Sequence, residues 1–330
     1  MRVVALEEHF TAPALTKRID PAVVARRGFR PRKMVPGRAN PMELAPEIGE
    51  IRLKSMDEAG IDVQVLSATG AGPDLLPGAD GAALAREIND HLAAACARHP
   101  KRFYGFASLP MATPEACAAE LERTVKQHKF LGALVNGTCE GRFLDHPSYD
   151  GLLAAAVQLD VPIYIHPHLP PEPVRLAYYD NLPDGADRVL ASAGWGWHQE
   201  TAIHVLRMVF NGVLDKHPKL KLVIGHMGEM LPVMLARIDE VSEADVGHLK
   251  RAPSRQIVEQ VWITNSGIFS QPPFIAALQT FGIDRLMFSV DYPYAPNSMG
   301  KKFLDEVALS PADFAKFTHG NADALLKIKP

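Results

Sequence analysis

Residues 3–10, VVALEEHF, combine a short apolar run with two carboxylates and an imidazole. The run Val3 to Leu6 predicts a short buried strand, because it is apolar and rich in β-branched residues. Side chains alternate along a strand, so Glu7 and His9 at its end face the same side and Glu8 faces away. Polar groups are expected at that place if the strand belongs to a barrel whose strands end at an open, functional face.

Seven further runs of this type recur along the chain, each followed by a turn and an amphipathic stretch such as Glu115 to His128 or Thr201 to Leu214. The runs are Val63 to Leu66, Phe103 to Phe106, Ala133 to Val135, Pro162 to Ile165, Leu220 to Ile224, Val261 to Thr264 and Leu286 to Val290. This alternation is expected of βα units around a buried parallel sheet. Eight units predict an α/β fold, a (β/α)8 TIM barrel that forms a single domain over residues 1–330.

Helix starts are indicated at two Pro-containing sites, Thr113-Pro114 and Ser310-Pro311, where an N-cap residue precedes Pro. Two stretches are irregular. Residues 18–46 contain many Pro, Arg and Gly residues and end before a helix predicted near Glu47, and residues 167–196 follow the fifth strand and carry Tyr178, Tyr179 and Trp195. We predict that they are insertions over the C-terminal face of the barrel. Their composition does not distinguish a lid from an interface.

Composition excludes several classes of partner. The net charge is −3 and charged residues make up 22% of the chain, which gives no basic footprint for nucleic acid. No apolar run approaches the ~20 residues that span a bilayer, and the N-terminus lacks the apolar core of a signal peptide. Three cysteines without close pairing suit a reducing compartment. We therefore expect a cytoplasmic protein that binds neither nucleic acid nor membrane.

Potential metal ligands stand at the ends of several predicted strands. His166 ends the fifth strand, His226 ends the sixth and Asp291 ends the eighth, in addition to Glu7 and His9 of the first. Groups at the top of a barrel converge on its axis, so these side chains are expected to meet. Mixed nitrogen and oxygen ligands fit Zn²⁺ or Mn²⁺, and the lack of cysteine at these positions excludes a thiolate-rich structural site.

The remaining histidines are weaker candidates, because a single histidine is more often a core or surface residue than a ligand. His168 could point into the same pocket as His166, although Pro167 interrupts the strand between them. We expect solvated or capping roles for His91, His99, His128, His146, His204, His217 and His248.

Five segments together resemble the amidohydrolase-related decarboxylases, and the γ-resorcylate and 2,3-dihydroxybenzoate decarboxylases in particular. Aminocarboxymuconate semialdehyde decarboxylases resemble the chain more distantly. The segments are ALEEHF at 5–10, YIHP at 164–167, IGHMGE at 224–229 with Arg237 downstream, SVDYPY at 289–294 and GNA at 320–322. The resemblance covers nearly the whole chain and is specific for the superfamily, but much less so for the substrate.

This resemblance implies roles for individual residues. Its metal ligands would be Glu7, His9, His166 and Asp291. His226 and Glu229 would form a catalytic dyad, and a carboxylate three residues after an imidazole could orient it and raise its basicity. Without the resemblance, Glu229 could equally be a first-turn residue favoured by the helix dipole.

Substrate-binding residues are implied in the same way. Arg237 would contact the substrate carboxylate or a ring substituent, although its alternative role is a surface ion pair. His168 and Tyr294 are the other candidates. Tyr292 and Tyr294 stand where the nearest relatives tend to carry Trp and Phe, which leaves the preferred ring substituents open.

Two features of the motifs bear on the metal and on the reaction. Residues 133–137, ALVNG, offer no lysine for the carbamate bridge of binuclear relatives, so one divalent ion is expected. Glu7 stands where hydrolytic members commonly place a histidine, which favours decarboxylases. Neither a dinucleotide fingerprint nor a P-loop is present, so no organic cofactor is expected.

We predict non-oxidative decarboxylation of a hydroxylated aromatic carboxylic acid, a small molecule bound to the metal through its phenolate and carboxylate oxygens. Asp291 would deliver a proton to the ring carbon that loses CO2, and His226 with Glu229 would handle the phenolic proton or stabilise the dearomatised intermediate. The same ligands also permit a hydrolase of a lactone or amide, and a barrel without catalysis would be a binding subunit. Since relatives are generally homo-oligomers, we expect a homodimer or homotetramer.

Overall fold

The computed structural model describes residues 1–29, 36–37, 39–70 and 72–329. Within these ranges, all eight predicted strands are present and every strand pair is parallel. The strands are β1 (Val4–Phe10), β2 (Val63–Ala68), β3 (Phe103–Gly105), β4 (Ala133–Asn136), β5 (Ile163–His166), β6 (Leu222–Ile224), β7 (Val261–Thr264) and β8 (Leu286–Met287).

The strands form the wall of the predicted barrel in two ladders, β1-β2-β3 and β4-β5-β6-β7-β8. A parallel bridge between Ala107 and Ala133 joins β3 to β4. At the other junction, β1 meets the segment after β8, where the His9 amide donates to the Tyr292 carbonyl at 2.6 Å. Because both junctions carry hydrogen bonds, the eight strands follow one another around the barrel in chain order.

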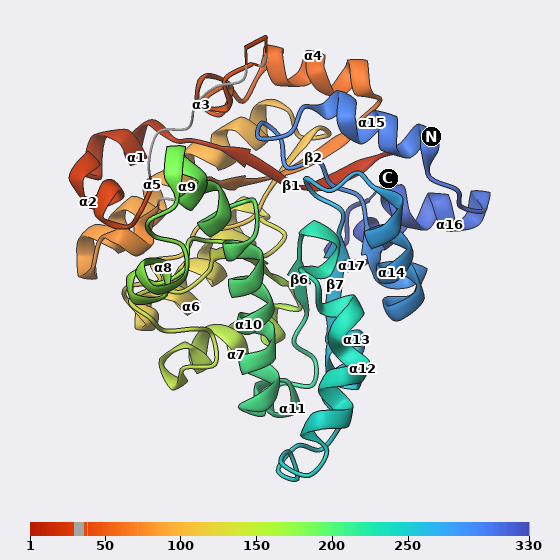
Figure 1. Ribbon diagram of the computed structural model, residues 1–330. Helices are drawn as coiled ribbons and strands as arrows, with labels where there is room; N and C mark the ends of the chain where they lie inside the picture. Colours follow the sequence, from red (N-terminus) through yellow and green to blue (C-terminus); the bar gives the residue numbers. More distant parts are fainter. Residues whose placement is uncertain (30–35, 38, 71, 330) are drawn as a thin grey trace.

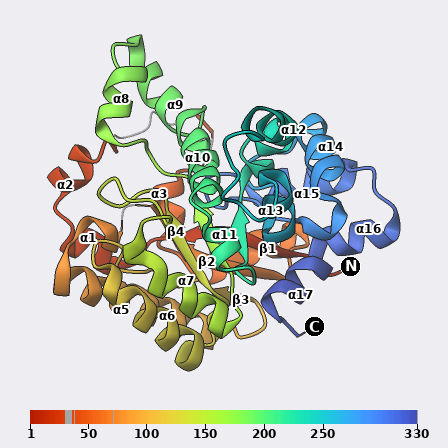
Figure 2. The same ribbon diagram turned by 90° about the horizontal axis from the view of Figure 1, so that it is seen from below.

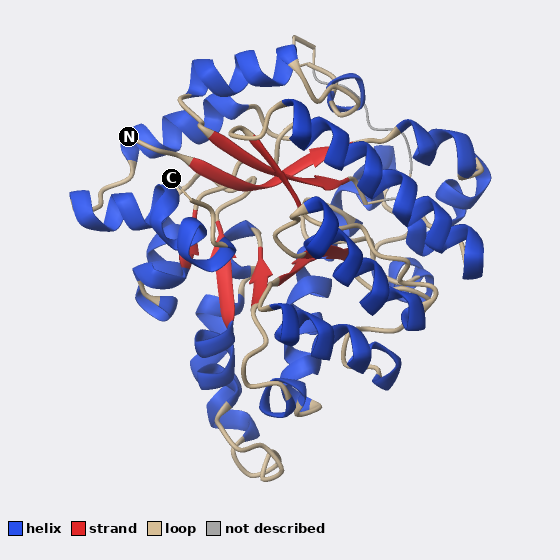
Figure 3. Cartoon of the chain, turned by 180° about the vertical axis from the view of Figure 1, so that it is seen from behind, coloured by secondary structure: helices blue, strands red, loops and turns tan. Residues whose placement is uncertain are grey.

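Helices surround this wall on the outside (Figures 1 and 3). Those of the first half are α1 (Pro13–Arg18), α2 (Pro21–Arg26), α3 (Pro41–Leu44), α4 (Glu50–Ala59), α5 (Gly78–Arg98), α6 (Pro114–Arg123) and α7 (Asp150–Leu159). Those that follow are α8 (Glu172–Tyr178), α9 (Ala186–Ala191), α10 (Gly196–Phe210), α11 (Val213–Lys216), α12 (Leu231–Ser242), α13 (Pro253–Gln260), α14 (Gln271–Phe281), α15 (Asn297–Glu306), α16 (Pro311–Ala315) and α17 (Asn321–Leu326). No described helix is both long and apolar enough to cross a bilayer.

The helix ends follow most of the predicted signals. The Ser310 hydroxyl accepts from the Asp313 amide at 3.1 Å and caps α16. Thr113 precedes α6 as predicted, but its hydroxyl donates to the Gly78 carbonyl instead of capping the helix. The helix predicted near Glu47 begins at residue 50, and the Glu47 carboxylate accepts from the Arg52 amide inside it.

The stretch predicted as one helix over 201–214 differs from the observed structure at both ends. It begins earlier, as α10 at Gly196, and it is interrupted at Gly212, whose φ of 71° lies in the left-handed region. A helix cannot continue through that conformation, so α11 starts as a separate turn.

The barrel interior is filled by a compact set of apolar side chains. Tyr164 and Phe106 are the largest of them, and their rings lie 5.9 Å apart. Residues of α17 pack into the same cluster and close the end of the barrel at which the strands begin, opposite their carboxyl ends. The register of β1 against β2 shifts between Ala5 and Glu8, so Leu6 packs in this cluster while the next residue, Glu7, contacts Tyr164.

The two predicted insertions contain short helices and contact each other. The described part of 18–46 holds α2 and α3, while residues 30–35 and 38 lie outside the described residues; the second insertion holds α8 and α9. Figure 2 shows α8 and α9 projecting from one end of α10. Arg27 ties the insertions together by donating to the Leu169 carbonyl at 3.0 Å.

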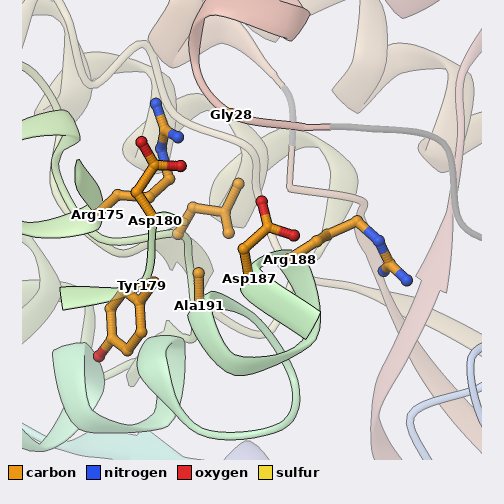
Figure 4. A pocket seen from close by; sticks show the side chains of 8 residues that line it. Gly28, Arg175, Tyr179, Asp180, Asp187, Arg188 and Ala191 are labelled. Atoms are coloured by element: carbon orange, nitrogen blue, oxygen red, sulfur yellow. The ribbon is translucent and has the colours of Figure 1, made fainter. Parts of the chain in front are cut away.

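A small pocket lies between the two insertions and is shown in Figure 4. Its lining includes Arg175, Asp180 and Arg188 from the second insertion and Gly28 from the first. None of the predicted site residues lines it.

Candidate metal centre and catalytic site

The four predicted ligands come together at the carboxyl ends of the strands. Glu7 and His9 belong to β1, His166 ends β5 and Asp291 follows β8. Each offers one ligand atom, and these atoms all lie within 4.8 Å of one another. Three of the four residues are buried and the Asp291 side chain is 18% exposed, so the side of Asp291 is the open side of the cluster.

Unpartnered polar atoms show that the cluster suits a cation. Glu7 Oε1 and His9 Nε2 are buried and have no hydrogen-bond partner among the described residues. Glu7 Oε1 lies 3.3 Å from His166 Nε2, and His9 Nε2 lies 3.2 Å from Asp291 Oδ1. Leaving such atoms unsatisfied costs about 1–3 kcal/mol each, which coordination would remove. Two carboxylates and two imidazoles are a donor set that fits one Zn²⁺ or Mn²⁺ ion.

The ligands are oriented by contacts behind them. Glu7 Oε2 accepts from the hydroxyls of Tyr164 and Ser266, which leaves Oε1 directed at the other ligands. His9 Nδ1 lies 3.2 Å from the Ser67 hydroxyl, so Nε2 is the nitrogen that faces the cluster. Such outer contacts fix ligand geometry in metal sites.

Burial controls the charges inside the cluster. It raises the pKa of Glu7, although the imidazoles of His226 and His9 act in the opposite direction. Burial, together with the adjacent His9 and His226, holds the pKa of His166 well below its usual range. His166 is therefore a neutral imidazole, which is the form that binds a metal.

The segment that carries Asp291 is held by Glu8, which faces away from the metal ligands as predicted. Asp291 has φ of 73°, a left-handed conformation that is rare for a residue with a side chain. The buried Glu8 carboxylate accepts from the amides of Val290 at 2.8 Å and Tyr292 at 2.9 Å, which flank Asp291. Burial raises the pKa of Glu8 to about 7, and these two hydrogen bonds oppose the shift.

His226 and Glu229 form the predicted pair beside the metal ligands. Glu229 Oε1 accepts from His226 Nδ1 at 3.0 Å, and His226 Nε2 lies 3.7 Å from Glu7 Oε1. Burial lowers the pKa of His226, but the carboxylates of Glu7 and Glu229 outweigh burial and raise it to about 10. A cation bound to Glu7 would weaken this effect, because its charge would offset that of the Glu7 carboxylate.

The sequence did not reveal a third member of this group, His198. It lies in the first turn of α10, and its Nδ1 is 2.7 Å from Glu229 Oε2. Glu229 lies before α12 in a left-handed conformation rather than in the first turn of a helix, so the helix-dipole explanation for it is wrong. No motif or strand end marks His198, because its contact depends on how α10 packs.

Known proteins match this arrangement along almost the whole chain. The sequence model of the amidohydrolase family matches residues 9–328. The chain belongs to the amidohydrolase family. The protein named Decarboxylase orsB of Emericella nidulans is 37% identical to this amidohydrolase over 334 residues, 99% of this chain and 97% of that one. Gamma-resorcylate decarboxylase of Rhodococcus jostii is 37% identical over 341 residues, 98% of each chain.

A solved structure extends these findings to the metal. Dihydroxybenzoic acid decarboxylase from Polaromonas sp. JS666, with bound manganese and the inhibitor 2-nitroresorcinol, is 34% identical to this amidohydrolase and matches it with a TM-score of 0.87. The match covers 99% of this chain and 97% of that one. These comparisons confirm the amidohydrolase-type barrel, the predicted decarboxylase branch and a metal-binding site.

The three candidate substrate residues of this amidohydrolase lie in different settings. The Tyr294 ring lies 5.7 Å from the His9 ring and is 40% exposed, at the open side of the cluster. His168 is buried and both its ring nitrogens are occupied, since Nδ1 lies 2.6 Å from Arg27 Nη2 and Nε2 lies 3.2 Å from the Gly70 carbonyl. That leaves no His168 nitrogen free for a metal.

Arg237 is not brought to the cluster in the described chain. Its side chain is 63% exposed and pairs with Glu240 at 3.1 Å on α12. The isolated chain therefore favours the surface ion pair over the substrate contact that the resemblance implies.

Among the histidines expected to be solvated or capping, His204 is a correction. It is fully buried in α10, and its Nε2 accepts from the Leu144 amide at 2.9 Å. Burial lowers its pKa to about 3, so it is a neutral core residue. The sequence did not reveal this because the burial of His204 depends on how α10 packs against the segment that contains Leu144.

Proposed function

We propose that this amidohydrolase removes CO2 from an aromatic carboxylic acid that bears a hydroxyl group beside the carboxylate, with one divalent ion held by Glu7, His9, His166 and Asp291. The observation that carries the proposal is the position of the Asp291 carboxylate. Its Oδ1 faces His9 Nε2 at 3.2 Å, while its Oδ2 is on the side of Gly267, which also borders the His226 ring. One oxygen can thus bind the ion while the other faces a substrate.

The ion supplies positive charge that orients the phenolate and carboxylate of the substrate and stabilises negative charge as the ring accepts a proton. We propose Mn²⁺ in preference to Zn²⁺. Carboxylate oxygens supply half of the donor set, and Mn²⁺ favours oxygen ligands. Thiolate ligands, which favour Zn²⁺, are absent from the four ligand residues. The related Polaromonas structure contains manganese.

Asp291 is the proposed proton donor. It takes up a proton from solvent at its exposed side and delivers it to the ring carbon that bears the carboxylate. The bond from that carbon to the carboxylate then breaks, and its electron pair restores the aromatic ring as CO2 leaves. Overall, one proton replaces one CO2, and no oxidant or reductant is needed.

His226 would act on the hydroxyl side of the substrate. Because its Nδ1 donates to Glu229, its Nε2 is the nitrogen presented to the open side of the cluster. There it would take up the phenolic proton on binding or hold it close to the phenolate oxygen during turnover. Tyr294 would contact the edge of the substrate ring, on the side of the site formed by the segment after β8.

We propose a homodimer or homotetramer as the working form. Because Arg237 is exposed and paired with Glu240, its implied contact with a substrate would be made across an interface between two copies. Sedimentation of the purified protein would give its oligomeric state. The Arg237→Ala variant, compared with the wild type in the same oligomeric state, would show whether the KM for the acid depends on this side chain.

A panel of hydroxybenzoates and lactones, assayed for CO2 release and ring opening, tests the proposed reaction. In D2O, one deuterium should appear at the carbon that loses CO2, since Asp291 exchanges its proton with solvent before each transfer. Metal analysis should give about one divalent ion per chain, and His166→Ala should lose most of it. Incorporation of solvent ¹⁸O into a new carboxylate, with no CO2 from any acid, would instead show a hydrolase.

A further inference from the structure

The loop after β6 has an unusual backbone that something must hold in place. Five successive residues have positive φ: His226 49°, Met227 58°, Gly228 82°, Glu229 53° and Met230 65°. Four of them carry side chains, which disfavour this left-handed region. The catalytic pair therefore stands on a strained turn, and contacts from outside the turn must offset the strain.

Two backbone hydrogen bonds span the turn itself. The Gly228 amide donates to the Gly225 carbonyl at 2.8 Å, and the Glu229 amide donates to the His226 carbonyl at 3.3 Å. The hydrogen bond between His226 and Glu229 joins two residues of the same turn, so it can move with the turn as a unit.

His198 supplies a contact from a different element. Each oxygen of the buried Glu229 carboxylate faces one imidazole: Oε1 faces His226 and Oε2 faces His198, whose Nδ1 is 2.7 Å away. The two rings lie 4.6 Å apart, inclined at 62°. Because a carboxylate oxygen is an acceptor, Nδ1 of His198 is the donor.

His198 is itself well anchored. It lies in the first turn of α10, the helix coloured green in Figure 1. Its Nε2 can accept from the Trp197 indole N–H at 3.3 Å when Nδ1 alone carries a proton, or donate to the Ala193 carbonyl at 3.0 Å when both ring nitrogens do. Further along α10, Thr201, His204 and Val205 are buried. The donor that reaches Glu229 is thus carried by a fixed helix, at the end of the second insertion.

We propose that His198 is a positioning residue for the reaction: it fixes the Glu229 carboxylate, which in turn holds Nδ1 of His226 and presents Nε2 of His226 to the substrate. The inference rests on the proposed function for its kinetic readout only. It also gives the second insertion a role, since the Ala193 carbonyl at its end lies 3.0 Å from Nε2 of the His198 ring and can accept from it when that nitrogen is protonated.

Matched variants test the role of the donor at Nδ1. The amide nitrogen of Asn can take the place of Nδ1, whereas that of Gln takes the place of Nε2. His198→Ala and His198→Gln should lower kcat on the order of 10- to 100-fold, the usual effect of a lost outer contact, with KM changed less than about 3-fold. His198→Asn should restore most of kcat. Metal content should stay at the wild-type value in all three, because His198 contacts none of the ligands. The exposed His248 serves as control, and His248→Ala should leave kcat unchanged.

Nuclear magnetic resonance gives a readout that does not depend on turnover. In ¹⁵N-histidine-labelled protein loaded with diamagnetic Zn²⁺, the Nδ1 proton of His226 should give a low-field signal, identified by its loss in His226→Asn. The signal should weaken or move upfield in His198→Ala and be retained in His198→Asn.

An unchanged signal and unchanged kcat in His198→Ala would overturn the proposal, as would equal loss in the Ala and Asn variants, which would mean that the ring only fills space. If the wild type releases CO2 from no hydroxybenzoate, the proposed function fails, and the signal still decides the contact.

Discussion

The segments after β6 and after β8 both place a catalytic side chain in a left-handed conformation, yet they are supported in different ways. The Asp291 segment has one such residue, and the Glu8 carboxylate binds the backbone amides on both sides of it. The turn after β6 has four such non-glycine residues, each costing about 1–2 kcal/mol, and is supported through the side chains of Glu229 and His198. The backbone around Asp291 is thus held by a residue of β1. The side chain of Glu229 is held by a residue of α10, the helix that follows the second insertion.

The difference teaches how each segment should respond to change. Glu8 belongs to the strand that also carries Glu7 and His9, so damage to it should reach the metal ligands as well as Asp291. His198 contacts none of the four metal ligands Glu7, His9, His166 and Asp291, which we call the quartet. A change at His198 should therefore affect only the pair His226 and Glu229. Variants of the two segments and of their supports can separate these effects.

The largest effect is expected at Asp291 itself. Asp291→Asn keeps the size and one oxygen ligand but cannot deliver a proton in the same way, so kcat should fall at least ~10²-fold. The aromatic acid should still bind with near-normal affinity. Calorimetric titration with the acid and steady-state kinetics measure the two quantities, and wild-type kcat in this variant would remove Asp291 from the proton transfer.

His226→Asn should lose most of its turnover while it keeps the metal. The variant preserves a polar side chain on the strained turn but lacks the Nε2 nitrogen that faces the cluster, 3.7 Å from Glu7 Oε1. Metal analysis beside kcat tests this expectation. Loss of the ion together with activity would mean that His226 is a ligand, contrary to its proposed place outside the quartet.

Glu8→Gln should damage the β8 side more broadly than His198→Ala damages the β6 side. The Gln amide group would face one of the two backbone amides and leave it unsatisfied, which costs about 1–3 kcal/mol of unfolding free energy. Denaturant unfolding should show this loss, and metal affinity should fall together with kcat. If Glu8→Gln lowers kcat alone, the two supports do not differ in the way proposed.

The smallest effect is expected at Gly267, which lies between the two segments. A Cβ there would meet His226 Cδ2 at 3.4 Å and Asp291 Oδ2 at 3.5 Å, and φ is +67°. Gly267→Ala should cost about 1 kcal/mol of stability through its backbone and should raise KM by narrowing the space for the substrate. Gly60→Ala is the matched control, because Gly60 has a similar φ of +70° and a Cβ added there would have no neighbouring atom within 4 Å in the described part of the chain. Only the Gly267 variant should change KM.

Residue order was sufficient for the barrel and for the convergence of the quartet. Apolar, β-branched runs separated by helical stretches identified all eight strands, because a strand buried on both faces leaves an unmistakable apolar run. Once the strands are parallel, their carboxyl ends meet at one face, so Glu7, His9, His166 and Asp291 had to converge wherever the helices lay. The alternation of side chains along a strand also predicted that Glu8 faces away from Glu7 and His9.

Tertiary packing settled the features that no local pattern encodes. His198 reaches Glu229 only because α10 begins at Gly196 and lies against the turn after β6, and neither fact has a periodic signature. The exposure of Arg237 follows likewise from which side of α12 packs inward. The left-handed turn at His226 to Met230 runs against the preference of four of its five residues. Local sequence reports local preference, whereas a conformation held by distant contacts becomes visible only when those contacts are in place.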